Sequence, residues 1–234
     1  MNRLRVGQLG GVAFVVASAV FAQEIGWLDL TDLHPRERIR SPHAGSGGCG
    51  GGAGFEPILS ANITLMYIDR TSYSVGEEVT YEVKIQNTGK EPIEIPWTPH
   101  LGDLEPGDPS ESYTYLHAAI SLDFTEPYSN RSFSIYANSY GSSDVAGTTR
   151  KLLPGETVFV RARQQLQTYE EWWQRRINDS SPLNVKVSAN LMLNKVTYSP
   201  GEKSDAAIDQ SVCIPVRTRT GASLDAALLP AKSK

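Results

Sequence analysis

Strict alternation of apolar and polar side chains is the feature that most constrains the fold of this chain. In residues 79–86 every second side chain is apolar, and a similar alternation recurs at residues 157–163, 185–193 and 211–217. Successive side chains of a β-strand point to opposite faces of the sheet, so each stretch predicts a strand with one buried face. Antiparallel sheets can leave one face exposed to solvent, and two such sheets can bury their apolar faces against each other. We therefore expect an all-β chain that forms an antiparallel sandwich of about seven to nine strands.

Further strands and a single helix complete the expected layout. Weaker alternation predicts strands at Ile63–Ile68, Ile93–Ile95, Tyr113–Leu122 and Ser132–Ala137. One short helix is expected near residues 169–177, because Thr168 and Glu171 stand at the spacing of a capping box. Trp172 and Trp173 lie on this helix, and two adjacent side chains of a helix cannot both face inward. We expect them to form a hydrophobic plug, with one of the two a candidate for aromatic contact with a partner.

The N-terminus has the pattern of an export signal. Arg3 and Arg5 precede an apolar, uncharged run that ends at Ala22, and Val20 and Ala22 are small residues suited to the cleavage point. The run of about 13 residues is shorter than the ~20 that a permanent membrane-spanning helix needs. We therefore expect a signal peptide at residues 1–22, and a periplasmic or secreted mature chain without a membrane span. An uncleaved N-terminal anchor is the alternative.

Composition divides the mature chain into a tail, one domain and a second tail. Residues 23–54 are expected to be a flexible N-terminal tail and linker, because Gly45–Gly54 holds seven glycines in ten positions. The apolar residues of this tail either pack on the domain surface, which is the favoured interpretation, or dock on a partner. The β-sandwich domain is expected at residues 55–220. Residues 221–234 are Ala-rich and are expected to be a disordered C-terminal tail.

Two turn motifs carry a family likeness. Tyr73-Ser74-Val75-Gly76-Glu77, an alternating strand and then Asn87-Thr88-Gly89 stand in order, and Leu153-Pro154-Gly155-Glu156 precedes another alternating strand. In these turns a glycine can adopt the positive φ that shapes the corner. The pattern resembles bacterial secreted immunoglobulin-like and fibronectin type III-like domains, and is similar in part to the bacterial intracellular proteinase inhibitor family. The likeness covers roughly residues 60–218 and implies an immunoglobulin-like sandwich, although the cysteine pair between the sheets of antibody domains is missing.

The chemistry-bearing residues are few. Cys49 and Cys213 are the two cysteines of the chain, and in an oxidising compartment they are candidates for a disulfide; free thiols or an intermolecular bond are the alternatives. The four histidines show no metal-ligand spacing, and no nucleophile elbow, metalloprotease motif or phosphate loop is present. We therefore predict no enzyme activity, no cofactor and no metal. A formal charge of -4 and a pI near 5.6 argue against a nucleic-acid partner.

These observations favour an exported, non-enzymatic binding or scaffolding module. Its partner would be an envelope or extracellular protein or a glycan. A proteinase inhibitor of immunoglobulin-like fold and an accessory domain of an extracellular hydrolase system are the alternatives. Specificity is expected in the loops Trp97–Ser112 and Tyr136–Thr149, where Trp97, Tyr136 and Tyr140 could supply rigid aromatic contacts, unless they only pack at the end of the sandwich.

Overall fold

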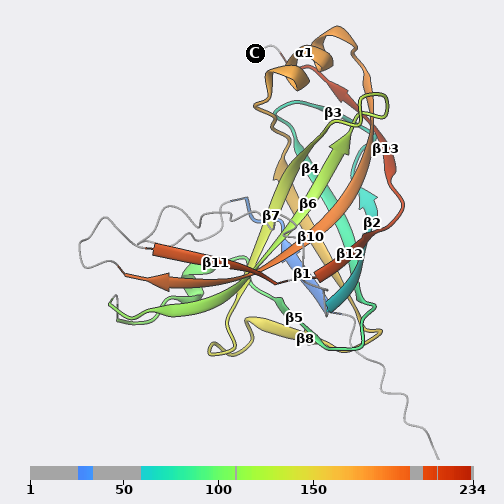
Figure 1. The fold of residues 1–234 in the computed structure, drawn as a ribbon. Coiled ribbons are helices and arrows are strands. Elements are labelled where there is room, and N and C mark those ends of the chain that lie inside the picture. Colours follow the sequence, from blue (N-terminus) through green and yellow to red (C-terminus); the bar gives the residue numbers. More distant parts are fainter. Residues whose placement is uncertain (1–25, 34–58, 109, 201–207, 215, 233–234) are drawn as a thin grey trace, which may run out of the picture.

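The computed structural model describes residues 26–33, 59–108, 110–200, 208–214 and 216–232. Strands make up most of this part of the chain (Figure 1). The one α-helix among the described residues, α1 (Glu171–Asp179), stands where a helix was expected, although the capping box does not form: Glu170 is the N-cap residue and no side chain caps the helix. The prediction of a mostly β chain is therefore confirmed.

The first sheet has five strands. Their order is β1 (Gly26–Leu30), β9 (Thr157–Gln165), β4 (Glu78–Asn87), β2 (Leu59–Ile68) and β12 (Val216–Thr220). The central strand β4 is antiparallel to both β9 and β2, while the two edge strands run parallel to their neighbours. Pairing of Val83 with Val160 and of Ile85 with Val158 places these apolar side chains together on one face, where all four are fully buried.

The second sheet has six strands. Their order is β3 (Ser72–Ser74), β13 (Leu224–Leu229), β10 (Leu183–Ser199), β6 (Tyr113–Thr125) and β7 (Ser132–Gly141), with β11 (Ile208–Ile214) paired to the far end of β10. Strand β13 is parallel to β3, and the other pairs are antiparallel. A small third sheet joins β5 (Ile93–Pro96) to β8 (Thr149–Leu152), and a 3-10 turn, η1 (Leu101–Leu104), follows β5.

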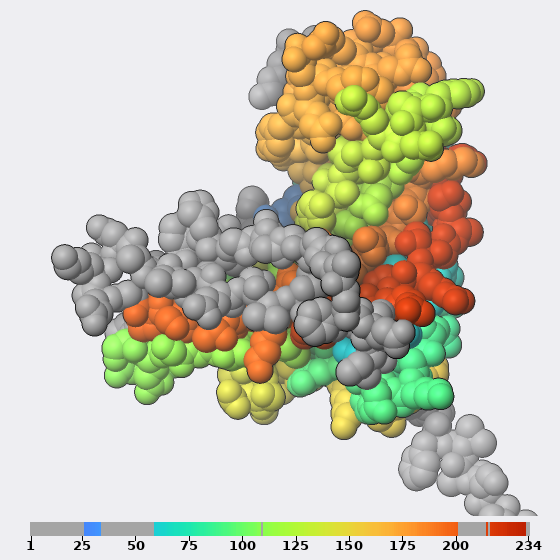
Figure 2. All heavy atoms as spheres, in the orientation of Figure 1, coloured from blue at the N-terminus to red at the C-terminus, as the bar shows by residue number. Residues whose placement is uncertain are grey.

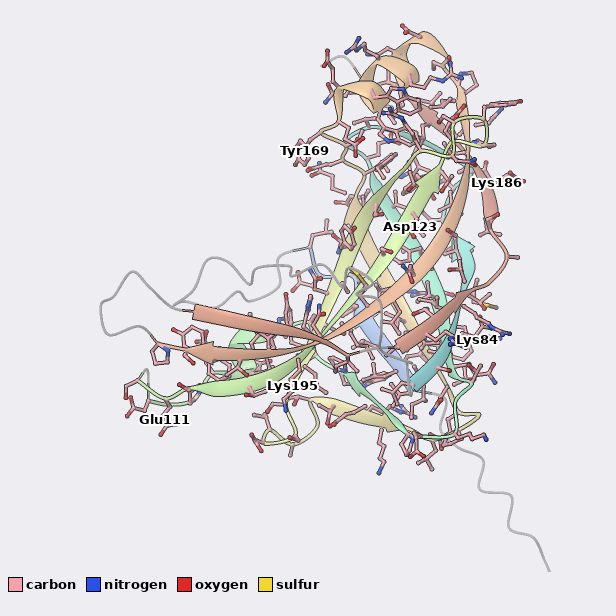
Figure 3. The ribbon with its side chains drawn as sticks, in the orientation of Figure 1. Lys84, Glu111, Asp123, Tyr169, Lys186 and Lys195 are labelled. Carbon is pink, nitrogen blue, oxygen red and sulfur yellow. The ribbon has the colours of Figure 1, made fainter. Side chains whose placement is uncertain are left out.

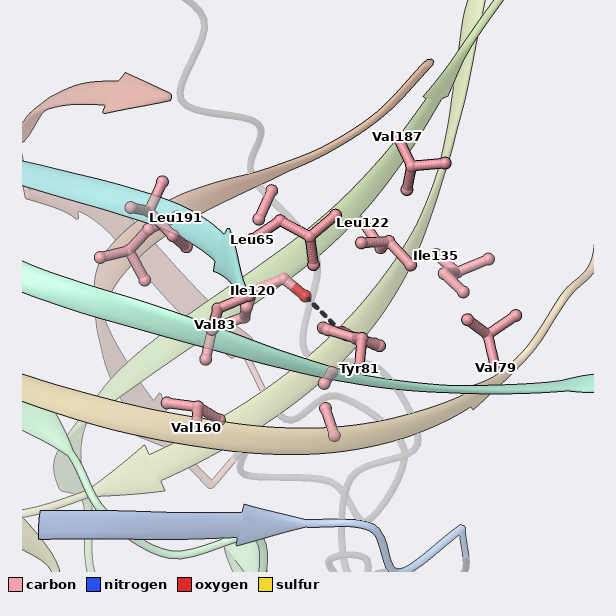
Figure 4. Packing of buried hydrophobic residues seen from close by; sticks show 14 of the residues in the cluster. Leu65, Val79, Tyr81, Val83, Ile120, Leu122, Ile135, Val160, Val187 and Leu191 are labelled. Atoms are coloured by element: carbon pink, nitrogen blue, oxygen red, sulfur yellow. Dashed lines mark hydrogen bonds between the residues drawn. The ribbon is translucent and has the colours of Figure 1, made fainter. Parts of the chain in front are cut away.

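The core lies between the two large sheets. Figure 4 shows side chains from β2, β4 and β9 facing those from β6, β7 and β10, with the Tyr81 hydroxyl donating a hydrogen bond to the carbonyl oxygen of Ile120 at 3.2 Å. Because these inward side chains come from alternate positions of each strand, the period of two read in the sequence sets the buried face. The turn glycines Gly76 and Gly155 have positive φ values of 94° and 83°, as their motifs predicted.

The sheets are mixed, so the predicted immunoglobulin-like antiparallel sandwich is not confirmed. Alternation shows which face of a strand is buried, but it contains no information about the direction of the neighbouring strand. The parallel strands come from the two ends of the chain. Gly26–Leu30, assigned to the flexible tail from the sequence, forms β1 with Leu28 and Leu30 buried, and residues 221–232, assigned to a disordered tail, contain β13 with Leu228 fully buried.

A side lobe projects from the sandwich. It consists of η1, the first residues of β6, the last residues of β10, and β11, and Figures 1 and 2 show it standing away from the main body. Its own apolar cluster is centred on Leu101, Leu104, Tyr115 and Val196. Tyr115 is an odd-numbered position of β6, whereas Ala118, Ile120, Leu122 and Phe124 face the main core from even positions. The strand therefore changes its buried face where it leaves the sandwich.

Candidate functional site

The two helix tryptophans belong to the core rather than to a contact surface. Trp173 is fully buried, and its ring meets the ring of Phe133 edge-on at 4.8 Å. Trp172 is half-buried, lies edge-on to Trp173 at 4.9 Å and carries the Arg131 guanidinium over its outer face at 4.8 Å. The pair closes one end of the sandwich, as expected of a hydrophobic plug.

Trp97 is held in the connection between β5 and η1. Its backbone N–H lies 3.1 Å from the carbonyl oxygen of Tyr140 and 2.8 Å from that of Thr148. Its half-buried ring packs on the main core and stacks under the Arg150 guanidinium at 5.2 Å. These hydrogen bonds hold the backbone of Trp97 beside that of Tyr140. Tyr140 lines a small pocket, and the Trp97 ring is not among the residues that line it.

Tyr136 and Tyr140 are brought together, on a strand rather than in a loop. They occupy alternate positions of β7 with Asn138 between them, so all three side chains lie on the outer face of the second sheet. A pocket of about 180 Å³ opens against them, which we call the Tyr136–Tyr140 pocket. Its other lining residues come from the end of β1 and the segment after it, from the connection before η1 and from β9: Leu30, Asp32, Leu33, Pro99 and Gln164.

The pocket lies where the edge strands of the two sheets meet. Strand β1 ends one side of the first sheet and β7 ends one side of the second, and Leu30 and Tyr136 line the pocket from these two edges. Leu30 is buried while the Tyr136 side chain keeps 46% of its surface exposed. Sequence reasoning found the two tyrosines as aromatic candidates but missed Asn138, Asp32 and Gln164, since three distant segments meet here only after folding.

A row of polar side chains supports the pocket from below. His117 on β6 pairs in register with Tyr140 on β7 and with Asn194 on β10. Its Nε2 lies 3.0 Å from the Asn138 Oδ1, its Nδ1 lies 3.5 Å from the Asn194 Nδ2, and its ring stacks on Tyr140 at 5.4 Å. The carboxamide oxygen needs a donor and the amide nitrogen needs an acceptor, so these contacts fit a neutral imidazole with its proton on Nε2.

Burial reinforces the neutral form of this histidine. It lowers the pKa of His117 below its usual 6.5, because the charged imidazolium loses solvation, and the bond to Asn138 only partly opposes this shift. Protonation of Nδ1 would also place a second donor against the Asn194 amide. The row Asn194–His117–Asn138 therefore holds Asn138 and Tyr140 in fixed positions at neutral pH.

The remaining sequence-based candidates stand as follows. Cys49 lies outside the described residues, and only the backbone of Cys213 is described, so their pairing stays a prediction. Within the described ranges, no group of three or more His, Cys, Asp or Glu side chains is placed to hold a metal ion. In the same ranges, no helix is both long enough and apolar enough to span a membrane.

Comparison with known proteins yields little. No known protein family and no curated protein matches the sequence. The chain is similar to the sporulation control protein Spo0M from Bacillus subtilis at a TM-score of 0.26 and 14% identity, over 68% of this chain and 50% of that one. It is similar to the ApaA protein from Bordetella pertussis at a TM-score of 0.27 and 17% identity, over 73% of this chain and 93% of that one. A β-glucosidase from Listeria innocua gives a TM-score of 0.27 and 13% identity, over 71% of this chain and 17% of that one. The match spans half of the Spo0M chain, and similarity at this level carries no argument about fold family or activity.

Proposed function

We propose that the chain is an exported, non-enzymatic binding module, and that a sugar of a neutral envelope or extracellular glycan occupies the Tyr136–Tyr140 pocket. The observation that carries this proposal is the convergence of two tyrosine rings and the Asn138 amide on one small pocket. Tyrosine presents a flat apolar face and a hydroxyl, and an amide both donates and accepts hydrogen bonds. A sugar ring offers the complementary surface of C–H groups and hydroxyls.

The size of the pocket favours a single ring. Its volume of about 180 Å³ is below the ~300–1,000 Å³ typical of sites for drug-sized ligands. Asp32 and Gln164 add a carboxylate and a second amide at the rim, which suits a ligand with several hydroxyls. We therefore propose one bound sugar unit, held within a longer glycan whose neighbouring units remain in solvent.

The proposal also includes secretion of the chain and an immunoglobulin-like sandwich that carries the pocket. The basic residues and apolar run of residues 1–22 support secretion to the periplasm or beyond. Two facing sheets joined by glycine turns support an immunoglobulin-like frame that carries additional parallel edge strands. A rigid frame of this kind presents a site in a fixed geometry, which lowers the entropy lost on binding.

Native affinity electrophoresis tests the proposal. The mature chain beginning at Gln23 is run through gels that contain dextran, xylan or hydroxyethyl cellulose as neutral glycan probes. We expect at least one of the three glycans to retard the wild-type chain, and Tyr136→Ala and Tyr140→Ala to remove the retardation. Tyr128→Ala serves as the matched control, because Tyr128 is 92% exposed and does not line the pocket.

The proposal is wrong if none of the three glycans retards the wild-type chain. It is also wrong if both pocket variants migrate like the control in the glycan that retards the wild type. Circular dichroism and a thermal melt of each variant show that a lost retardation reflects the site and not unfolding.

A further inference from the structure

A second concave surface lies on the first sheet, at the edge formed by β2 and β12. It is a groove of about 710 Å³, which we call the Arg217–Arg219 groove. The described residues of its lining carry hydroxyl, amide and guanidinium groups and no carboxylate: Ser60, Asn62, Thr88, Arg217, Arg219, Thr220, Gly221 and Ala222. None of these residues lines the Tyr136–Tyr140 pocket.

The parallel pairing of β12 with β2 sets the positions of the two arginines. Arg217 pairs with Ser60 and Arg219 pairs with Asn62. Both arginines occupy alternate positions of one strand, so they project from the same face with their Cα atoms about 6.4–6.8 Å apart. Thr218 between them points the other way and donates its hydroxyl to the Leu191 carbonyl at 3.2 Å, which anchors β12 to the second sheet.

Gly221 brings the end of β12 close to β2. Its N–H donates to the Ile63 carbonyl at 2.7 Å. A Cβ atom at this position would stand 2.8 Å from the Thr64 Oγ1 and 3.1 Å from the Thr64 Cα, which leaves no room for a side chain. The close approach fixes β12, and with it the two arginines, against the sheet.

Among the described residues, no side chain neutralises the charges of the two groove arginines. On the same sheet Arg161 pairs with Glu82 at 2.6 Å and Arg163 pairs with Glu78 at 3.6 Å. Within the described ranges, Arg217 and Arg219 form no ion pair and no hydrogen bond through their side chains. Lys84, labelled in Figure 3, faces the same side from β4 and pairs in register with Thr64. A positive strip therefore stands on a chain whose formal charge is -4.

We infer that the Arg217–Arg219 groove binds an acidic polysaccharide, that is, a chain of sugars that carry carboxylate groups. A guanidinium group can donate two parallel hydrogen bonds to one carboxylate. The two guanidinium groups along β12 therefore suit an extended ligand whose carboxylates repeat along its length. The hydroxyls of Ser60, Thr88 and Thr220 are suited to the uncharged hydroxyls of the same ligand.

The lining argues against the other polyanions. Peptide interfaces are centred on aromatic, arginine or apolar side chains buried in fitting pockets, and among the described lining residues the only wholly apolar side chain is the methyl of Ala222. An acidic peptide also lacks the repeated hydroxyls that Ser60, Thr88 and Thr220 can bind. A single-stranded nucleic acid needs aromatic platforms on which its bases stack, and no aromatic residue of the described ranges lines the groove. Polar groups around two arginines suit a ligand that is both acidic and hydroxylated.

Isothermal titration of the mature chain with oligogalacturonate tests the inference. We expect wild-type binding that weakens as salt is added, and no heat with the fully methyl-esterified oligomer, which lacks the charges. Arg217→Gln and Arg219→Gln should each weaken binding about tenfold or more, since each removes charge-assisted hydrogen bonds. Arg175→Gln is the matched control: it removes the same charge from α1, where Arg175 pairs with Glu171 on the helix surface.

Three results would overturn the inference. The first is no binding of oligogalacturonate by the wild-type chain, and the second is equal binding by the wild type and the Arg217→Gln/Arg219→Gln double variant. The third is tighter binding of poly-L-glutamate than of oligogalacturonate, which would assign the groove to acidic peptides instead. Tyr136→Ala should leave oligogalacturonate binding unchanged, so failure of the proposed neutral-glycan site and failure of this groove are told apart.

Discussion

At the scale of single residues, His117 connects the charge state of one ring to the shape of a pocket. Its two ring nitrogens meet an acceptor on Asn138 and a donor on Asn194, and its face supports the ring of Tyr140. Asp123 stands six residues further along the same face of β6, about 20 Å away by strand geometry, and its carboxylate accepts a hydrogen bond from the Ser134 hydroxyl at 2.7 Å. The amides around His117 therefore define its tautomer, and burial opposes its protonation.

This arrangement predicts a loss of stability in mild acid. The folded pKa of His117 is lowered below 6.5, so the unfolded chain binds the proton more readily than the folded chain. The free energy of unfolding should be constant above pH 6.5 as far as this group is concerned, and should fall as the pH drops below it. Urea unfolding at pH 7.5 and pH 5.5 measures the change, and His117→Gln should show a smaller difference between the two values. An equal difference in both proteins would remove His117 as the cause.

At the scale of elements, α1 is fastened to the β6–β7 turn by three contacts of different kinds. Trp173 packs on Phe133, Arg131 covers Trp172, and the Arg176 guanidinium lies 3.3 Å from the Glu126 carboxylate. A hydrogen bond from the Ser129 side chain is the largest of several causes that lower the pKa of Glu126. The backbone N–H of Ser129 also donates to this carboxylate at 2.6 Å. The fully buried Trp173 supplies apolar burial to this attachment. The ion pair joins a partly exposed guanidinium to a carboxylate that is 1% exposed.

The two adjacent tryptophans should therefore differ in their contribution to stability. Trp173→Ala removes a fully buried indole and should lower the free energy of unfolding by about 3–5 kcal/mol. Trp172→Ala should lower it by much less, because half-buried Trp172 already contacts solvent. Chemical denaturation of both variants measures the difference. Similar losses in the two variants would show that Trp172 carries as much of the packing as Trp173.

The elements also show what could be predicted from the sequence. The central strands were found because Val79, Tyr81 and the residues that follow them alternate strictly, and burial on one face produces that pattern. Strands β1 and β13 were missed: each is short, and Leu28 and Leu30 of β1 stand in the segment that precedes the glycine linker. Their parallel direction depends on contacts with strands far away in the chain, and local alternation contains no record of those contacts.

At the scale of the whole molecule, the two ends of the chain complete the sheets. Strand β1 adds to β9, while the last segment crosses repeatedly between layers, with β11 in the second sheet, β12 in the first and β13 in the second again. The two ends of the chain also contribute to the two proposed sites: Leu30 and Asp32 line the Tyr136–Tyr140 pocket, and β12 supplies the arginines of the groove. The tyrosines were visible in the sequence, whereas the partners that make a pocket or a groove depend on this topology.

Strand β1 should therefore be a stabilising part of the fold. Leu28→Ala should lower the free energy of unfolding by about 2–5 kcal/mol, as expected for a leucine in a well-packed core; Leu28 is 4% exposed. Trp27→Ala, next to it, should cost less, because Trp27 is 51% exposed and contacts mainly the Phe159 ring at 5.1 Å. Urea denaturation of the pair checks this expectation. A Leu28→Ala variant as stable as the wild type would show that β1 is only loosely attached.

The strands β6 and β10 change their buried face where they pass from the sandwich into the side lobe. Both strands are continuous through this point, so the lobe is joined to the sandwich by β-structure and not by a linker. The crossover falls at His117 and Asn194, which underlie the Tyr136–Tyr140 pocket. The same two strands therefore carry both the lobe and the residues that support the pocket, so a bend of the lobe relative to the sandwich would displace His117 and Asn194.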